Sequence, residues 1–311
     1  MRRFFVKFYG IIILINLIFI FFTKEEFPRE SAKIEKKVEK VEKKVEEKVE
    51  EKVEKIPQEI KKEEVKIEEV KIEKPKYKLK KVTYRTIKIH NLKELNEKRE
   101  GNYVYSDDGI DLRKLSGVKR KNAFIKLLLP GIKVVQKEII CERENIEYLR
   151  EVKNYTPEEK KYLVNIFSKY RVKYGDFKSL KSRLIVYPTS LILTQGAIES
   201  AWGTSRFFRE GNNIFGIWSS NKNEPRIKAG QSRGKFTAYL RAYPNLKDCI
   251  GDLVLTLSRL NVYEPLRRAV NRGDSPSEIA RYLNKYSEQG EVYVKKVQGV
   301  LNYNKFQQYD K

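Results

Sequence analysis

Hydrophobic residues change their spacing several times along this chain, and the first pattern is an uncharged, mostly apolar run at the N-terminus. Phe8–Phe22 carries no charge and follows Arg2, Arg3 and Lys7. A helix over this run covers about 22 Å, less than the ~30 Å hydrocarbon core, but Lys7 can snorkel and the preceding apolar residues extend it. No A-x-A-like cleavage site follows. We therefore expect residues 1–24 to be an uncleaved membrane anchor, with a cleaved signal peptide as the alternative.

Basic residues before the anchor predict that the rest of the chain lies outside the cytoplasm. We expect a single-pass protein of the cell inner membrane, with its remaining residues in the periplasm.

Residues 25–76 contain a low-complexity segment in which Lys and Glu alternate with sparse aliphatic residues. The aliphatic positions are separated by three or four residues, which is typical of one face of a helix: Ile34, Val38, Val41, Val45, Val49, Val53 and Ile56. Glu–Lys pairs four residues apart favour the same helix. Because the apolar stripe is thin, we expect a charged helical spacer, with weak coiled-coil self-association as the alternative.

Residues 77–116 alternate in the manner of a strand over YKLKKVTYRTIKIHNL, and DDGIDL resembles a turn. We expect a basic linker or a small strand pair here. A nucleic-acid contact through Tyr77 and Tyr84 is the alternative, and the periplasmic placement argues against it. We assign no role to His90.

From Lys121 onward the apolar residues recur at helical spacing. Thr156-Pro157-Glu158-Glu159 is typical of a helix start. A second helix is expected from Pro188, with Gly203 as its stop. Residues 219–240 are polar and end in the strand-like KFTAYLRAY. The pattern therefore predicts a mainly α domain over residues 117–311, with a small β-hairpin lobe.

Composition narrows the chemistry of this domain. The chain has 66 Lys+Arg against 42 Asp+Glu, a net charge of +24, which favours an anionic partner. One histidine and two cysteines are too few for a zinc cluster of Cys and His, so we expect no metal and no cofactor. Whether Cys141 and Cys249 form a disulfide stays open.

The clearest candidate for catalysis is Glu199, near the end of the expected apolar helix. Gln195 lies four residues before it and Trp202 three residues after it, so the three side chains share one neighbourhood. Desolvation at such a place raises the pKa of a carboxyl and keeps it protonated for use as a general acid. A glutamate in a structural ion pair is the alternative.

The succession of ESAWGTSRF and NNIFGIW resembles the bacterial glucosaminidases of glycoside hydrolase family 73, and their Bax-type branch most of all. The resemblance extends to FIKLLLPGIKVVQKEIICERENI (Phe124–Ile146) and YSEQGEVYVKKVQGVLNYNKFQQYD (Tyr286–Asp310). It implies a lysozyme-like α+β fold, with Glu199 as the catalytic acid. It also implies that Asn213 and Phe215 line the sugar groove and that Tyr286 lies at the cleft.

Four more side chains belong to the expected site, as substrate contacts or as a second carboxylate. Gln195 and Trp202 are candidate substrate contacts beside Glu199, and Trp218 offers an aromatic face on which a sugar ring can stack, with core packing as its alternative. Most glycosidases need a second carboxylate. Glu224 is the only acid between Gly211 and Lys247, so it is the candidate by elimination. The alternative is attack by the 2-acetamido oxygen of the substrate.

Together these features predict a peptidoglycan hydrolase that cleaves the GlcNAc-β-1,4-MurNAc bond, with glycan strands and the inner membrane as partners and no nucleic acid. A muramidase or lytic transglycosylase is the alternative enzyme, although no GLMQ-like run follows Glu199. A catalytically silent wall-binding protein is the alternative from another class.

Overall fold

The computed structural model describes residues 77–107, 110–230 and 237–310. The expected membrane anchor and the expected Lys/Glu-rich spacer lie outside these ranges, so both stay predictions. Within the described ranges, no helix combines the length and the apolar character that a membrane crossing requires. The chain divides into two compact units, residues 1–78 and 79–311, and the second contains almost everything described below.

The second unit is mainly helical, as predicted, and contains two small sheets. Its α-helices are α3 (Gly117–Glu151), α4 (Pro157–Lys169), α5 (Phe177–Arg183), α6 (Thr189–Glu199), α7 (Arg206–Gly211), α8 (Leu246–Arg259), α9 (Glu264–Arg272), α10 (Pro276–Ile279) and α11 (Glu291–Tyr303). The strands are β1 (Arg85–Ile89), β2 (Tyr103–Asp107), β3 (Arg226–Lys228) and β4 (Tyr239–Arg241). Short 3₁₀ helices are η1 (Glu94–Asn96), η2 (Leu112–Lys114), η3 (Asn261–Tyr263), η4 (Ala280–Leu283) and η5 (Phe306–Tyr309).

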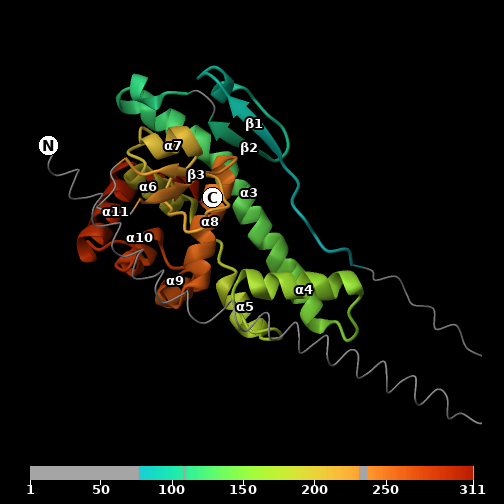
Figure 1. The fold of residues 1–311 in the computed structure, drawn as a ribbon. Helices are drawn as coiled ribbons and strands as arrows, with labels where there is room; N and C mark the ends of the chain where they lie inside the picture. The colour runs from blue at the N-terminus through green and yellow to red at the C-terminus, as the bar shows by residue number, and fades with distance from the viewer. Residues whose placement is uncertain (1–76, 108–109, 231–236, 311) are drawn as a thin grey trace, which may run out of the picture. The chain divides into compact units, whose positions relative to one another are not determined.

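The long helix α3 runs through this unit and packs against β2, α6 and α8 (Figure 1). It approaches α8 closely because Gly131 has no side chain. A Cβ at Gly131 would lie 3.2 Å from the Cα of Lys247, at the start of α8. Phe124 and Leu128 face α6, since a Cβ at Gly196 would meet both side chains within 3.3 Å. Through these contacts α3 packs the segment that contains β2 against the same core as α6 and α8.

Two predicted helix starts are confirmed. The Thr156 side chain and Glu159 form a capping box, with Pro157 at the first helical position of α4. Pro188 caps α6 with a φ of −57°, and the helix begins at Thr189. The expected stop at Gly203 is displaced, because α6 ends at Glu199, before a turn of left-handed residues.

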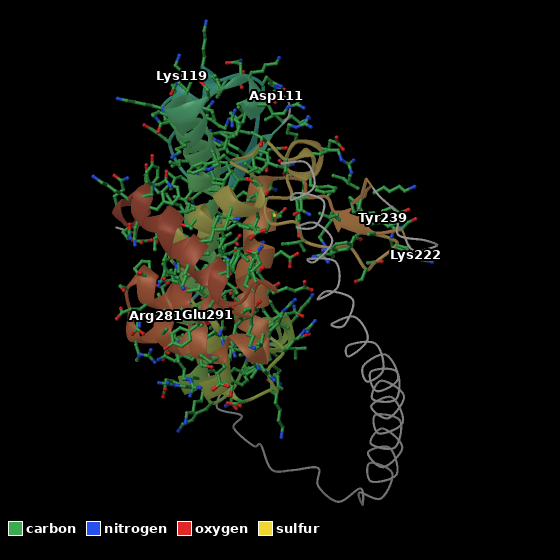
Figure 2. The ribbon with its side chains drawn as sticks, turned by 90° about the vertical axis from the view of Figure 1, so that its left-hand side faces the viewer. Asp111, Lys119, Lys222, Tyr239, Arg281 and Glu291 are labelled. Atoms are coloured by element: carbon green, nitrogen blue, oxygen red, sulfur yellow. The ribbon has the colours of Figure 1, made fainter. Side chains whose placement is uncertain are left out.

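The β-hairpin lobe is also confirmed. β3 and β4 pair antiparallel with Ile227 opposite Leu240, and Trp218 extends this pairing through a bridge to Leu240. Figure 2 shows the lobe from the side, with Tyr239 and Lys222 labelled at its outer end.

Residues 79–116 differ from the expected linker, because they fold into the same compact unit as the helices. β1 and β2 pair in parallel, with Thr86 opposite Val104, through a connection that contains η1. Ile89, Val104 and Leu112 are fully buried. Leu112 reaches the turn after Glu199, since a Cβ at Gly203 would lie 2.6 Å from its Cδ1. The domain therefore begins near residue 79 and not at Gly117.

A buried amide fixes the start of this segment. Asn145, on α3, accepts a hydrogen bond from the backbone N–H of Lys80 (2.8 Å) and donates one to the Lys80 carbonyl (2.9 Å). Parallel pairing depends on residues far apart in sequence. This explains why local alternation predicted a strand but not its place in the core.

We expect a chain that begins at Gly117 to be much less stable than one that begins at Tyr77. The shorter chain exposes the partners of Ile89, Val104 and Leu112, and burial of each such side chain contributes roughly 1.5–3 kcal/mol to the free energy of unfolding. Urea unfolding of both chains measures the difference. Equal midpoints would show that residues 77–116 do not support the domain.

Candidate active site

The candidate site is built around Glu199, the last residue of α6. All residues of α6 from Thr189 to Ala197 are buried, whereas Glu199 is partly exposed. Its Oε1 accepts a hydrogen bond of 2.8 Å from the hydroxyl of Tyr293, on α11. Burial raises the pKa of Glu199 to about 7, although the Tyr293 hydrogen bond and the charge of Lys296 both act to lower it. A carboxyl in this state is protonated in a large fraction of molecules near neutral pH, which general acid catalysis requires.

A strained turn follows Glu199 and redirects the chain. Ala201, Trp202 and Gly203 are all left-handed, with φ values of 50°, 61° and 74°. This conformation costs a non-glycine residue roughly 1–2 kcal/mol. Ser200 holds the turn, because its hydroxyl accepts from the N–H of Gly203 (2.8 Å) and donates to the Gly196 carbonyl (2.6 Å). Strain of this kind fixes where α6 stops, and so where the Glu199 carboxyl lies.

Gln195 lies one turn before Glu199 and is fully buried. Its Oε1 accepts a hydrogen bond of 3.0 Å from the hydroxyl of Tyr187. Its amide lies beside the Tyr293 hydroxyl, yet the amide nitrogen makes no hydrogen bond of good geometry within the described residues. The structure thus brings Gln195 and Glu199 together at one tyrosine, as the spacing along the helix predicts.

Two tyrosines from the C-terminal part of the chain complete this cluster. The rings of Tyr286 and Tyr293 stack with centroids 5.4 Å apart and an interplanar angle of 23°. Burial, followed by the proximity of Glu199, raises the pKa of both phenols well above 10, so both remain hydrogen-bond donors. Tyr286 makes no side-chain hydrogen bond within the described residues, so its hydroxyl is available to a ligand.

Tyr293, for which the sequence alone favours core packing, is a site residue in this structure, since its hydroxyl donates to Glu199. It lies seven residues after Tyr286, and Gly290, with a φ of 52°, turns the chain between them into α11. The available signal was an apolar, aromatic position on the first turns of α11, which core packing explains equally well. Only the contact with Glu199 distinguishes the two interpretations.

The loop after α7 contains the two residues that the resemblance places in the sugar groove. The Asn213 side chain is buried and donates to the carbonyls of Ile217 (2.9 Å) and Arg241 (2.7 Å), while its Oδ1 accepts from the Ile217 N–H (2.9 Å). Phe215 is also buried in the core. In this structure both residues shape the loop, and Asn213 has its hydrogen-bonding groups occupied by backbone.

The two tryptophans lie in different surroundings. Trp202 packs edge-on against Phe124, with centroids 5.7 Å apart, and the Lys121 ammonium lies 5.0 Å from its ring centroid. Trp218 is partly buried on the lobe, and its indole N–H has no hydrogen-bond partner among the described residues.

Glu224 lies at the base of the lobe in an ion-paired network. Its Oε2 is 3.0 Å from the Nε of Arg241, which also pairs with Asp252 of α8. The Tyr243 hydroxyl donates to the same Asp252 carboxylate at 2.7 Å. Within the described residues, no hydrogen bond or ion pair joins Glu224 to Glu199. Glu224 and Asp252 therefore share the single positive charge of Arg241 in this structure.

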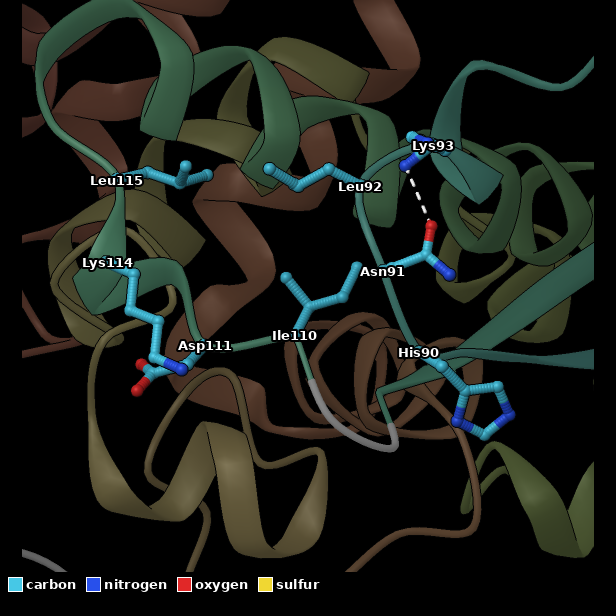
Figure 3. A pocket seen from close by; sticks show the side chains of 8 residues that line it. All are labelled: His90, Asn91, Leu92, Lys93, Ile110, Asp111, Lys114 and Leu115. Carbon is cyan, nitrogen blue, oxygen red and sulfur yellow. Dashed lines mark hydrogen bonds between the residues drawn. The ribbon is translucent and has the colours of Figure 1, made fainter.

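A cavity of about 540 Å³ lies elsewhere, between the segment after β1 and η2 (Figure 3). Leu92, Ile110 and Leu115 line it together with polar residues, and Asn91 accepts a hydrogen bond from the Lys93 N–H at 3.0 Å. None of the expected site residues lines this cavity, so its position gives no reason to move the candidate site away from Glu199.

The described part of the chain contains no group of three or more His, Cys, Asp or Glu side chains that could hold a metal ion. Cys141 and Cys249 are both free thiols in this structure. The Cys249 sulfur accepts a hydrogen bond from the Ile214 N–H at 3.3 Å, and burial raises the pKa of this thiol to about 12. Cys249 therefore supports the Asn213 loop as a neutral side chain.

Comparisons with known proteins agree with the resemblance seen in the sequence. Residues 175–306 match the family model described as glucosaminidase, mannosyl-glycoprotein endo-beta-N-acetylglucosaminidase. Protein bax of Escherichia coli (strain K12) is 28% identical over 196 residues, which cover 59% of this chain and 69% of that protein.

Two solved structures are also similar. The glycoside hydrolase domain of FlgJ from Salmonella typhimurium is 25% identical, with a TM-score of 0.32, over 47% of this chain and 87% of that one. The catalytic domain of the autolysin Auto from Listeria monocytogenes is 19% identical, with a TM-score of 0.34, over 54% of this chain and 97% of that one.

The raised pKa of Glu199 predicts a specific pH dependence of stability. The ordinary pKa of a glutamate is 4.5, and the folded value is about 7, so the folded state binds the proton more tightly. The Glu199 contribution is therefore fully present below pH 4.5 and is lost as the pH rises to about 7. We expect Glu199→Gln to gain stability relative to wild type between pH 5.5 and pH 8, measured by urea unfolding. The exposed Glu158→Gln is the control, and an equal response of the two variants would contradict the raised pKa of Glu199.

Proposed function

We propose that the protein hydrolyses the glycan strands of peptidoglycan, because its residues 175–306 match the glucosaminidase family model. We assign the cut to the GlcNAc-β-1,4-MurNAc bond, with Glu199 as the general acid. The environment of the Glu199 carboxyl supports this proposal most directly. The carboxyl lies at the end of a buried helix, its pKa is raised to about 7, and it accepts a hydrogen bond from Tyr293. The net charge of +24 also suits an anionic polymer as substrate.

The Tyr293 hydrogen bond determines which oxygen of Glu199 can act. Because the Tyr293 hydroxyl donates to Oε1, this oxygen serves as the acceptor, and the proton of the neutral acid resides on Oε2. In the first step Glu199 transfers this proton to the glycosidic oxygen, so the leaving sugar departs as a neutral alcohol. The resulting carboxylate can then accept a proton from the water that completes hydrolysis. Tyr293 stabilises that carboxylate through the same bond.

The nucleophile is the second part of the proposal. Glu224 is already paired with Arg241, so its use as a catalyst would require this ion pair to be broken or displaced. Tyr286 lies beside Glu199, and its hydroxyl, which makes no hydrogen bond with the described residues, can donate to the 2-acetamido group of the substrate. These contacts favour attack by the acetamido oxygen, with Glu224 as the alternative. The same ion pair is the observation that favours a catalytically silent wall-binding protein.

The identity of the new reducing end tests this proposal. Purified peptidoglycan is digested with the protein, the products are reduced with borohydride, and the reduced sugar is identified. We expect reduced GlcNAc, whereas a muramidase gives reduced MurNAc and a lytic transglycosylase gives a 1,6-anhydro ring that is not reduced. Glu199→Gln keeps the shape of the side chain but cannot donate the proton, so we expect a loss of roughly 10²–10⁴-fold. Glu158→Gln is the matched control.

Glu224→Gln separates the two nucleophiles in the same assay. Acetamido assistance predicts a change of only a few fold, and a two-carboxylate mechanism predicts a loss as large as that of Glu199→Gln. Binding of wild type to peptidoglycan without any new reducing GlcNAc would contradict the enzyme and support the silent binder.

A further inference from the structure

A second cavity of about 540 Å³ lies between α3 and the segment that connects β1 to β2, and its lining is strongly basic. Lys126, Lys133 and Lys137 line it from α3, and Arg99 lines it from the connecting segment. None of its lining residues is acidic. We call this cavity the basic groove.

The three lysines of the basic groove form a row along one face of α3. Positions 126, 133 and 137 differ by seven and four residues, which places them within about 20° of one direction and along about 16 Å of the axis. Phe124 and Leu128, which contact α6, point to the opposite face of the same helix. The body of α3 therefore separates the basic groove from the helix that carries Glu199.

The charges of these lysines are not cancelled within the described part of the chain. Lys126 donates to the amide oxygen of Asn96 at 2.6 Å, and Lys137 donates to that of Asn102 at 2.7 Å. Neutral amides orient the ammonium groups but leave their charge in place. Lys133 is exposed and makes no hydrogen bond or ion pair with any described residue.

Two other cations near the groove form ion pairs with acidic residues, and the three lysines of the row differ from them in this respect. Lys247 pairs with Glu138 at 2.8 Å, although Glu138 neighbours Lys137 in sequence. Arg99 pairs with Glu97 at 2.7 Å and contributes little net charge. The groove thus presents three ammonium groups that repel one another, and an anionic ligand would relieve that repulsion.

We propose that the basic groove binds the carboxylates of peptide stems on a glycan strand other than the one being cleaved. This inference rests on the proposed function, because peptidoglycan is the ligand. Peptide stems carry several carboxylates along an extended chain, which matches a row of single ammonium groups. Tyr103, which is partly buried on the groove wall, adds an aromatic face for the aliphatic parts of a stem. Because peptidoglycan is a network, one strand can occupy the Glu199 site while a neighbour occupies the groove.

Two simultaneous contacts with one network increase the apparent affinity without any change at the catalytic site. Lysine contacts with exposed carboxylates are individually weak and are screened by salt. The groove therefore acts as a reversible hold on the wall, strongest at low ionic strength.

The test measures binding of the full chain, in detergent and with Glu199→Gln to prevent cleavage, to insoluble peptidoglycan by sedimentation. The groove variant carries Lys126→Gln, Lys133→Gln and Lys137→Gln. The matched control carries Lys153→Gln, Lys160→Gln and Lys161→Gln, which remove the same charge from exposed positions that do not line the groove. Circular dichroism verifies that both are folded. We expect binding of the groove variant to be roughly tenfold weaker at low salt, and binding of the control to change much less.

A second arm uses peptidoglycan whose carboxylates have been amidated. The proposal predicts that the parent protein binds it as weakly as the groove variant binds native peptidoglycan, and that the two proteins no longer differ. Equal affinities of groove and control variants on native peptidoglycan would overturn the proposal. So would a loss by the groove variant that appears only with vesicles containing anionic phospholipid, because a membrane surface would then be the partner.

The proposed enzymatic activity and the proposed role of the groove can be contradicted separately. If wild type releases no reducing GlcNAc but binding still depends on the groove lysines, only the enzymatic assignment is contradicted. If wild type is active and binding ignores those lysines, only the groove is contradicted.

Discussion

Placement of one carboxyl at the end of a buried helix is the constraint on which the rest of the structure depends. α6 is buried along almost its entire length, so Glu199 has little water around it and its pKa is raised to about 7. The surrounding elements maintain this position from several directions. The turn through Ala201 and Trp202 ends the helix at Glu199, Tyr293 holds one carboxyl oxygen, and the buried Gln195 amide lies beneath both.

The long helix α3 makes that arrangement possible, since it separates two sides of the domain. One face of α3 packs Phe124 and Leu128 against Gly196 on α6, where an added Cβ would lie within 3.3 Å of both side chains. The same helix also packs against β2 and η2, and Leu112 of η2 lies beside Gly203. Residues 79–116, which precede the predicted domain in sequence, therefore support the turn at the candidate site.

Sequence patterns predicted the parts of the fold that local chemistry decides. The capping box at Thr156, the helix start at Pro188 and the hairpin lobe are specified by neighbouring residues, and the structure contains all three. The closeness of Gln195 and Glu199 follows from helix geometry and is also present. The parallel pairing of β1 with β2 was not predictable in this way, because it depends on contacts between distant segments.

The sequence also could not assign a role to side chains that suit either packing or function. Asn213 and Phe215 carry a motif that resembles a sugar-binding loop, yet their side chains are used to build the loop in this structure. Tyr293 is the reverse case. Its place on α11 suggests core packing, but its hydroxyl donates a hydrogen bond to Glu199. Glu224 was identified by elimination, and only its distance of 3.0 Å from Arg241 shows that it is ion-paired. Burial, hydrogen bonds and ion pairs in the folded chain, which a single sequence does not contain, decide these cases.

The most direct test of this account is the pKa of Glu199 itself, measured by NMR titration of the side-chain carboxyl carbon and assigned with Glu199→Gln. We predict a value near 7 in the wild type, since burial is the dominant cause of the shift. Tyr293→Phe should move it higher still, because the lost hydrogen bond favours the charged form. A value near the ordinary 4.5 in the folded protein would contradict the central claim, since Glu199 would then be ionised at neutral pH and unable to act as the acid.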